Sequence, residues 1–131
     1  MRTDAREFAF KMIFEKLFKD GDEALSFNAI SEDKALNEVD LKFYEELFNS
    51  FKENQDEIEA IIKSNCEGYD LDRIYKVDLA LLYLAAVELK FIKTPPQVVI
   101  NEVLNISKKY STDKSGGFIN GVLSKVVKAL W

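Results

Sequence analysis

The sequence has 131 residues and a net charge of −5, and 47% of its residues are hydrophobic. This size and composition suit a single domain, residues 1–131, with a buried core, and they exclude a disordered or low-complexity chain. The chain has no histidine and one cysteine, Cys66, which excludes an internal disulfide and every nucleophile that a histidine activates. We expect a cytoplasmic protein that is not an enzyme and holds no cofactor or metal.

Charge is unevenly distributed along the chain. Residues 1–19 carry a net charge of +2, residues 20–72 a net charge of −12 and residues 73–131 a net charge of +5. If the two basic ends meet in the fold, they form a surface that can hold phosphate groups despite the acidic pI of about 4.9. The alternative is that these charges belong to ordinary solvated helix faces.

Apolar residues recur at helical spacing along the first half of the chain. A first helix is expected to begin with Asp4 as its N-cap and to end near residues 20–21, where a glycine can close it. A weaker helix is expected over residues 23–30. A long helix should follow over residues 38–64, with a bend in the polar stretch 53–57.

The second half of the chain is also predicted to be helical. Residues 71–92 are apolar nearly all round, which is typical of a helix buried on both sides. Such a helix either lies between two sub-bundles or is covered by a partner on one side. Two prolines, at 95 and 96, start the next helix, and a polar loop at 111–117 precedes the last one. The longest apolar run, 79–87, is far shorter than the roughly 18 residues of a membrane span, so no membrane association is expected.

Two stretches carry candidate contacts for RNA. Arg2 and Arg6 stand among phenylalanines in the first helix, and such cations suit contact with phosphate. Lys114 precedes two glycines and an expected helix start, where free backbone N–H groups and the helix dipole favour an anion. Phe118 comes directly after the glycines; it either stacks on a base or packs beneath the loop. Cys66 is expected to be structural, because a neighbouring acid raises the pKa of a thiol.

Three sequence blocks resemble a known family. The first is AREFA, residues 5–9, in the first expected helix. The second is DRI, residues 72–74, followed by Asp78 and by VEL, residues 87–89. The third is Pro95 followed by VVINE, residues 98–102, and, after a loop, by FINGVL, residues 118–123. Together these blocks resemble the NusB family of bacterial transcription antitermination factors over essentially the whole chain. The last block is the most specific of the three.

The resemblance implies an all-α fold of two packed three-helix bundles. It also implies binding of boxA RNA together with NusE, a small-subunit ribosomal protein, within a transcription elongation complex that resists termination, notably in ribosomal RNA operons. The positions that match the family's RNA contacts are Arg2, Arg6, Lys114 and Phe118. Those that match its partner surface are Phe14 and Asp78, to which we add Tyr75 and Leu82, about one turn on either side of Asp78.

Two other functions remain open at this stage. One is the NusB-like RNA-binding domain of ribosomal RNA cytosine methyltransferases, which would need a catalytic domain after Trp131. The other is a helical protein-interaction module without RNA binding. The oligomeric state is also open, and a homodimer could use the surfaces that the resemblance assigns to its partners.

Overall fold

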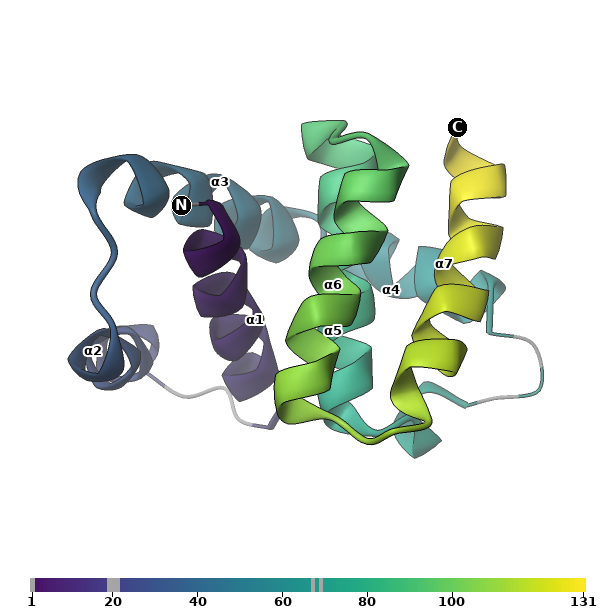
Figure 1. Cartoon of the computed structure of the whole chain (residues 1–131), viewed down its shortest axis with the longest axis horizontal. Helices are drawn as coiled ribbons and strands as arrows, with labels where there is room; N and C mark the ends of the chain where they lie inside the picture. Colours follow the sequence, from purple (N-terminus) through teal and green to yellow (C-terminus); the bar gives the residue numbers. More distant parts are fainter. Residues whose placement is uncertain (1, 19–21, 67, 69) are drawn as a thin grey trace.

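The computed structural model describes residues 2–18, 22–66, 68 and 70–131 (Figure 1). These residues form helices and no strands, which confirms the predicted all-α class. None of the helices in these ranges is long and apolar enough to cross a membrane. The elements are α1 (Arg2–Phe18), α2 (Glu23–Asp33), α3 (Glu38–Glu53), α4 (Gln55–Ser64), a 3₁₀ turn (Leu71–Arg73), α5 (Lys76–Val87), a π-helical turn (Glu88–Ile92), α6 (Pro96–Tyr110) and α7 (Ser115–Leu130).

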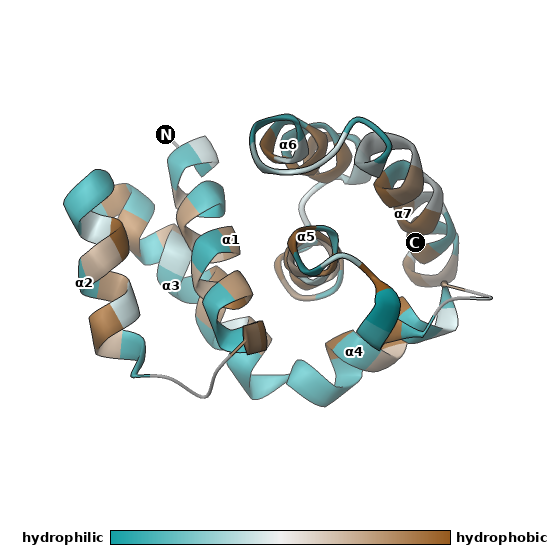
Figure 2. Ribbon diagram, turned by 90° about the horizontal axis from the view of Figure 1, so that it is seen from below, coloured by the Kyte–Doolittle hydropathy of each residue, from teal (hydrophilic) through white to brown (hydrophobic). Residues whose placement is uncertain are grey.

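The helices form two packed bundles around α5, as Figure 2 shows. Helices α1, α2 and α3 make up the N-terminal bundle. The C-terminal bundle contains α4, α6 and α7, with α5 at its centre. Helix α1 packs against both α3 and α5, so it joins the two bundles.

The predicted bend in the long helix 38–64 is a break at Asn54. This residue has φ −126° and ψ 26°, outside the helical region, and its side-chain amide donates to the carbonyl of Ser50 at 2.9 Å. The break lets one amphipathic segment serve both bundles, because α3 packs on α1 whereas α4 packs on α5 and α7.

Helix α5 is enclosed by its own chain. Every residue from 77 to 87 is buried, and α1, α3, α4, α6 and α7 all pack against the helix. Of the two alternatives that the apolar pattern left open, the helix between two bundles is therefore the one observed. The π-helical turn follows directly and ends at Lys93, whose φ of +64° is left-handed.

Three predicted helix starts differ from the structure. The helix predicted over residues 71–92 begins as α5 at Lys76, after the separate 3₁₀ turn Leu71–Arg73. Helix α1 begins at Arg2, so Asp4 lies in the first turn and is not the N-cap; its carboxylate accepts a hydrogen bond from Lys34 Nζ at 2.8 Å. The predicted end at residues 20–21 falls outside the described residues. Helix α7 begins at Ser115 and not at Phe118. Its two glycines are therefore part of the first helical turn, and the loop before α7 is shorter than predicted.

Candidate nucleic-acid interface

Arg6 lies inside the molecule, where it connects three elements. Its Nε and Nη2 donate to the two carboxylate oxygens of Glu88 at 2.7 and 2.8 Å, and its Nη1 donates to Glu102 Oε1 at 3.0 Å. The residue is only 3% exposed, and Glu88 is fully buried. Burial alone would lower the pKa of the guanidinium, but the two carboxylates outweigh it and raise that pKa. Arg6 thus stays charged and ties α1 to the π-helical turn and to α6.

Two threonines complete this polar cluster. Thr94 Oγ1 donates to Glu88 Oε1 and Thr3 Oγ1 donates to Glu102 Oε1, both at 3.0 Å. With its guanidinium engaged in this way, Arg6 is not presented to a ligand in this conformation. The sequence predicted it as an RNA contact, whereas the structure gives it the role of holding the N-terminus of α1 in place.

Arg2 is an exposed cation at this end of the molecule. Its guanidinium carbon lies 4.4 Å from the ring centroid of Phe43 in α3, a distance at which the ring face attracts a cation. Because Thr3 and Arg6 both bind Glu102, Arg2 lies beside the N-terminal half of α6. The contact with Phe43 restricts the position of the guanidinium, and the Arg2 side chain is still exposed to solvent.

Asp78 anchors the loop between α6 and α7. Ser111 Oγ donates to Asp78 Oδ1 at 2.5 Å, and Ser115 Oγ donates to Asp78 Oδ2 at 3.0 Å. Ser115 Oγ also accepts from the backbone N–H of Thr112 at 3.3 Å. Asp78 is 6% exposed, so this carboxylate, predicted as a partner contact, serves in the structure to fix both ends of the loop to the start of α5.

Sequence reasoning missed the two serines of this cluster. A signal for them existed, because Asp78 is the single carboxylate of α5, a helix whose following residues, 79 to 87, include no charged side chain. A buried carboxylate needs hydrogen-bond donors, and the hydroxyls nearest to the expected helix ends were candidates. Nothing in the local sequence, however, showed that donors 33 and 37 residues further along the chain would supply them.

Lys114 ends the loop and Phe118 lies in the first turn of α7. Lys114 is exposed and directly precedes the first turn of α7, and its carbonyl accepts the N–H of Phe118 at 3.4 Å. Phe118 is half-buried and packs against the core. This packing agrees with the predicted contact beneath the loop, and the stacking of the ring on a base stays a prediction.

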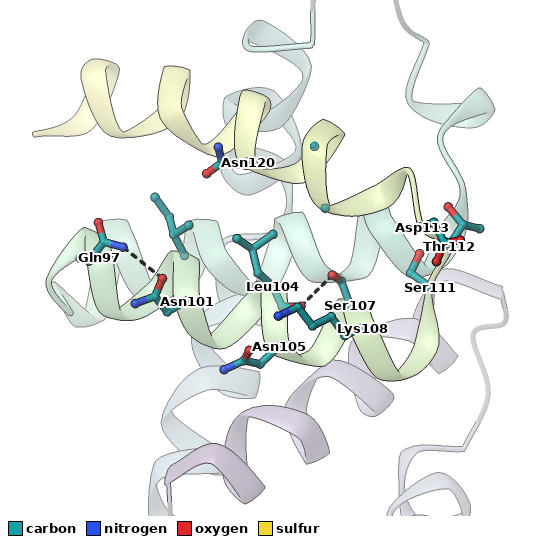
Figure 3. Close-up of a pocket in the computed structure, with 13 residues that line it drawn as sticks. Gln97, Asn101, Leu104, Asn105, Ser107, Lys108, Ser111, Thr112, Asp113 and Asn120 are labelled. Carbon is teal, nitrogen blue, oxygen red and sulfur yellow. Dashed lines mark hydrogen bonds between the residues drawn. The ribbon is translucent and has the colours of Figure 1, made fainter.

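A polar groove runs between α6 and α7 (Figure 3). Its volume is about 720 Å³, within the range of ligand sites. Gly116 and Gly117 form part of its wall, and a Cβ at either position would meet no atom within 4 Å. The remaining lining residues are Gln97, Ile100, Asn101, Leu104, Asn105, Ser107, Lys108, Ser111, Thr112, Asp113 and Asn120.

The predicted cations do not form one cluster. Arg2 lies near the N-terminal half of α6, Lys114 follows the C-terminal end of that helix, and Arg6 is buried where α1 meets the π-helical turn and α6. Figure 1 shows the N-terminus and the α6–α7 loop at opposite ends of the bundle. The expectation of a single basic face is therefore replaced by two separate exposed cations.

The predicted partner residues fall into exposed and buried groups. Phe14 is half-buried in a row of aromatic rings, with centroids 6.2 Å from Phe10 and 4.8 Å from Phe18, and Phe10 in turn lies 5.4 Å from Tyr110 of α6. Tyr75 is 53% exposed just before α5. Leu82, in contrast, is 0% exposed, because α5 is covered on all sides; it is a core residue and does not extend the partner surface.

No metal or thiol chemistry is built into the described parts of the chain. Within these ranges, no group of three or more Cys, Asp or Glu side chains is arranged to hold a metal ion. Cys66 is buried, and burial raises the pKa of its thiol. A thiol of this kind is a poor nucleophile at neutral pH, which agrees with a structural role.

Solved structures share this arrangement of helices. The structure of T. maritima NusB matches with a TM-score of 0.87 and 32% identity, covering 98% of this chain and 91% of that one. A chain in the crystal structure of antitermination factors NusB and NusE in complex with dsRNA matches with a TM-score of 0.88 and 29% identity, covering 98% and 96%. These likenesses define the class of the protein: it has the all-α fold of bacterial antitermination factors.

The sequence comparisons specify the family. Residues 3–128 match the sequence model of the NusB family. The transcription antitermination protein NusB of Finegoldia magna is 34% identical, and the match covers 97% of this chain and 93% of that protein. The NusB protein of Acetivibrio thermocellus is 38% identical, and the match covers 97% of this chain and 88% of that protein. The chain belongs to the NusB family.

Proposed function

We propose that this protein is a cytoplasmic transcription antitermination factor that binds the boxA element of nascent RNA together with NusE. The observation that carries the proposal is the match, over 98% of the chain, to a structure of NusB and NusE in complex with dsRNA. The role consists of binding, and no chemical step is part of it. By holding RNA and a ribosomal protein at once, the protein would join a transcription elongation complex to its transcript.

Three residues form the proposed RNA surface. Arg2 provides exposed positive charge beside the N-terminal half of α6, and Lys114 provides it after the C-terminal end of that helix. Phe118, four residues after Lys114, offers a partly accessible ring. Cations release counterions when they bind phosphate, and aromatic rings stack on unpaired bases. Arg6 contributes indirectly, because its pairing with Glu88 and Glu102 fixes the turn of α1 that carries Arg2.

The proposed partner surface is the outer part of the aromatic row of α1, Phe14 and Phe18, together with Tyr75, whereas Phe10 of the same row is buried. Exposed aromatic side chains are typical anchors of protein interfaces. Phe18 is 56% exposed, so this row has an accessible apolar end. The same row could hold a second copy of this chain, and a homodimer is therefore the competing state to be measured.

RNA binding is tested by fluorescence anisotropy with a short single-stranded RNA that carries boxA, with and without NusE. We expect binding that weakens as salt rises, because phosphate contacts release counterions. Lys114→Gln should reduce the slope of log affinity against log salt by about 0.7, the value for one phosphate of a single strand. Lys42→Gln, which removes an exposed lysine of α3, is the matched control. A wild-type protein that binds no boxA RNA at low salt, even with NusE, would refute the proposal.

Partner binding is tested by titrating NusE into the protein and measuring the mass of the complex by light scattering. Phe14→Ala should weaken the complex by about 2 kcal/mol if Phe14 is a central anchor. Leu25→Ala, at an exposed position of α2, is the control for loss of an apolar side chain elsewhere. A mass near twice 15.0 kDa without NusE would identify the homodimer instead.

A further inference from the structure

The groove between α6 and α7 has an unusual side-chain chemistry for the surface of a charged protein. Gln97, Asn101 and Asn105 follow one another at four-residue spacing along α6, and Asn120 faces the groove from α7. All four amides are exposed. An amide carries donors and an acceptor together; Asn101 Oδ1 already accepts from Gln97 Nε2 at 3.0 Å, which leaves the Asn101 amide N–H groups for a ligand (Figure 3). The lining contains one carboxylate, Asp113, and one lysine, Lys108.

The groove also offers apolar surface and open space. Half-buried Ile100 and Leu104 supply apolar surface between the amides. On the α7 side, the absence of side chains at Gly116 and Gly117 leaves open space where any other residue would project. Apolar surface flanked by amide groups suits an aromatic heterocycle whose edge carries hydrogen-bonding groups.

The position of the groove links the two separate cations. It extends from Asp113, next to Lys114, to Gln97 in the first turn of α6. Arg2 lies beside the N-terminal half of the same helix. A strand that runs along α6 from Lys114 towards Arg2 passes this groove, whose lining carries hydrogen-bonding groups from Asp113 to Gln97.

We propose that the α6–α7 groove is a base-reading site for single-stranded RNA. In this proposal, which rests on the proposed function above, the amides of Asn101, Asn105 and Asn120 hydrogen-bond the edges of unstacked bases. Proteins read single-stranded RNA in this way, through the Watson–Crick and Hoogsteen edges of splayed bases. The groove thus supplies sequence preference, while Arg2 and Lys114 supply the part of the affinity that depends on phosphate.

Two variants test the groove without touching the core. Asn101→Ala/Asn120→Ala removes two exposed amides, and Gly117→Trp fills the groove from a position where a Cβ has free space. Asn28→Ala, which removes an exposed amide from α2, is the matched control. Melting temperature is recorded for each variant, and binding is measured well below it with boxA RNA and with a scrambled RNA of equal length.

We expect both groove variants to bind boxA RNA roughly tenfold more weakly than the wild type, as for the loss of one well-made base contact. Their salt slope should equal that of the wild type, because no charge has been removed. The preference for boxA over the scrambled RNA should shrink in the double variant, and Asn28→Ala should behave as the wild type. A general structural defect would lower the affinity for both RNAs alike and reduce the melting temperature.

Three results would overturn the proposal, and they can be told apart. Groove variants that bind boxA RNA with wild-type affinity and preference would exclude the groove, while the proposed function would stand. Groove variants that lose NusE but keep their RNA affinity would assign the groove to a protein. A wild-type protein that binds no RNA would refute the proposed function and the groove proposal with it.

Discussion

The two polar clusters of the interior differ in chemistry and in what they hold. The cluster around Arg6 is ionic and connects α1, the π-helical turn and α6. The cluster around Asp78 is built from hydroxyl groups on a carboxylate, and connects α5 with both ends of the α6–α7 loop. Each buried charge supports an exposed cation nearby, Arg2 in the first case and Lys114 in the second. The residues that resemble the family's contact positions therefore include buried residues that position a binding surface as well as exposed residues proposed to contact the ligand.

The largest difference between the clusters should appear when their central charges are removed. Arg6→Ala leaves the fully buried Glu88 without its charged partner, which typically costs about 3–5 kcal/mol of unfolding free energy. Urea denaturation followed by circular dichroism measures this loss. Arg2→Ala serves as the control and should change stability by less than about 1 kcal/mol. Equal stability of Arg6→Ala and the wild type would show that the ion pair does not form in solution.

Asp78→Ala should have a smaller effect on stability and a clear effect on RNA binding. It leaves the hydroxyls of Ser111 and Ser115 without their acceptor, for which about 1–3 kcal/mol is expected. Because the loop loses its anchor, affinity for boxA RNA should fall even when NusE is absent. Ser115→Ala should reproduce part of this loss. If Asp78→Ala loses only NusE and binds RNA normally alone, Asp78 is a direct partner contact and not a loop anchor.

Phe118 tests whether the loop that Asp78 anchors contacts RNA directly. If its accessible part stacks on a base, Phe118→Ala should weaken RNA binding by about 1–3 kcal/mol. Since the ring is only half-buried, the loss of stability should be less than the ~3–5 kcal/mol of a fully buried phenylalanine. Both quantities can be measured on one preparation, by anisotropy and by thermal melting. A variant that melts early but binds boxA RNA normally at low temperature would end the stacking role.

The smallest effect is expected at a third contact between α1 and α6. Glu7 accepts hydrogen bonds from Tyr110 Oη at 2.6 Å and from Lys109 Nζ at 3.3 Å. Burial would raise the pKa of this carboxyl, but these partners outweigh it and lower the pKa below its ordinary value of 4.5. A lowered pKa in the folded state means stabilisation that is present above pH 4.5 and is lost as pH falls further. Glu7→Gln should therefore flatten the acid limb of the stability curve, as measured by urea denaturation below pH 4.5, and leave stability near pH 7 only slightly reduced.

The helices could be predicted because their determinants are local. The apolar period located every helix, and the polar residues around Asn54 marked the break between α3 and α4. The start of α7 was misplaced since glycine has a low helix propensity, which suggested that Gly116 and Gly117 belong to the loop. In the structure, Ser115 is held by Asp78 and by Thr112, and these tertiary contacts start the helix before the glycines.

The roles of individual site residues were harder to predict because they depend on distant partners. Arg6 is separated from Glu88 by 82 positions in the sequence, and no local pattern shows that a cation in the first helix is paired. Leu82 illustrates the opposite problem: in a helix that is apolar all round, no periodicity distinguishes a partner-facing residue from a core residue. Lys114, Arg2 and Tyr75 each stand at or next to a helix end and are exposed, as a contact residue must be, and their roles stay predictions.

The central position of α5 has a consequence for how the protein could be divided. The exposed turn at Gly68 separates a piece that contains α1–α4 from a piece that contains α5–α7. Neither piece alone can enclose α5, because the helices that pack around it belong to both pieces. Expressed together as two chains, the pieces would each present a large apolar face that only the other can cover. NusB-family proteins of this design are thus candidates for split reporters, in which reassembly of the fold signals that two fused proteins have met.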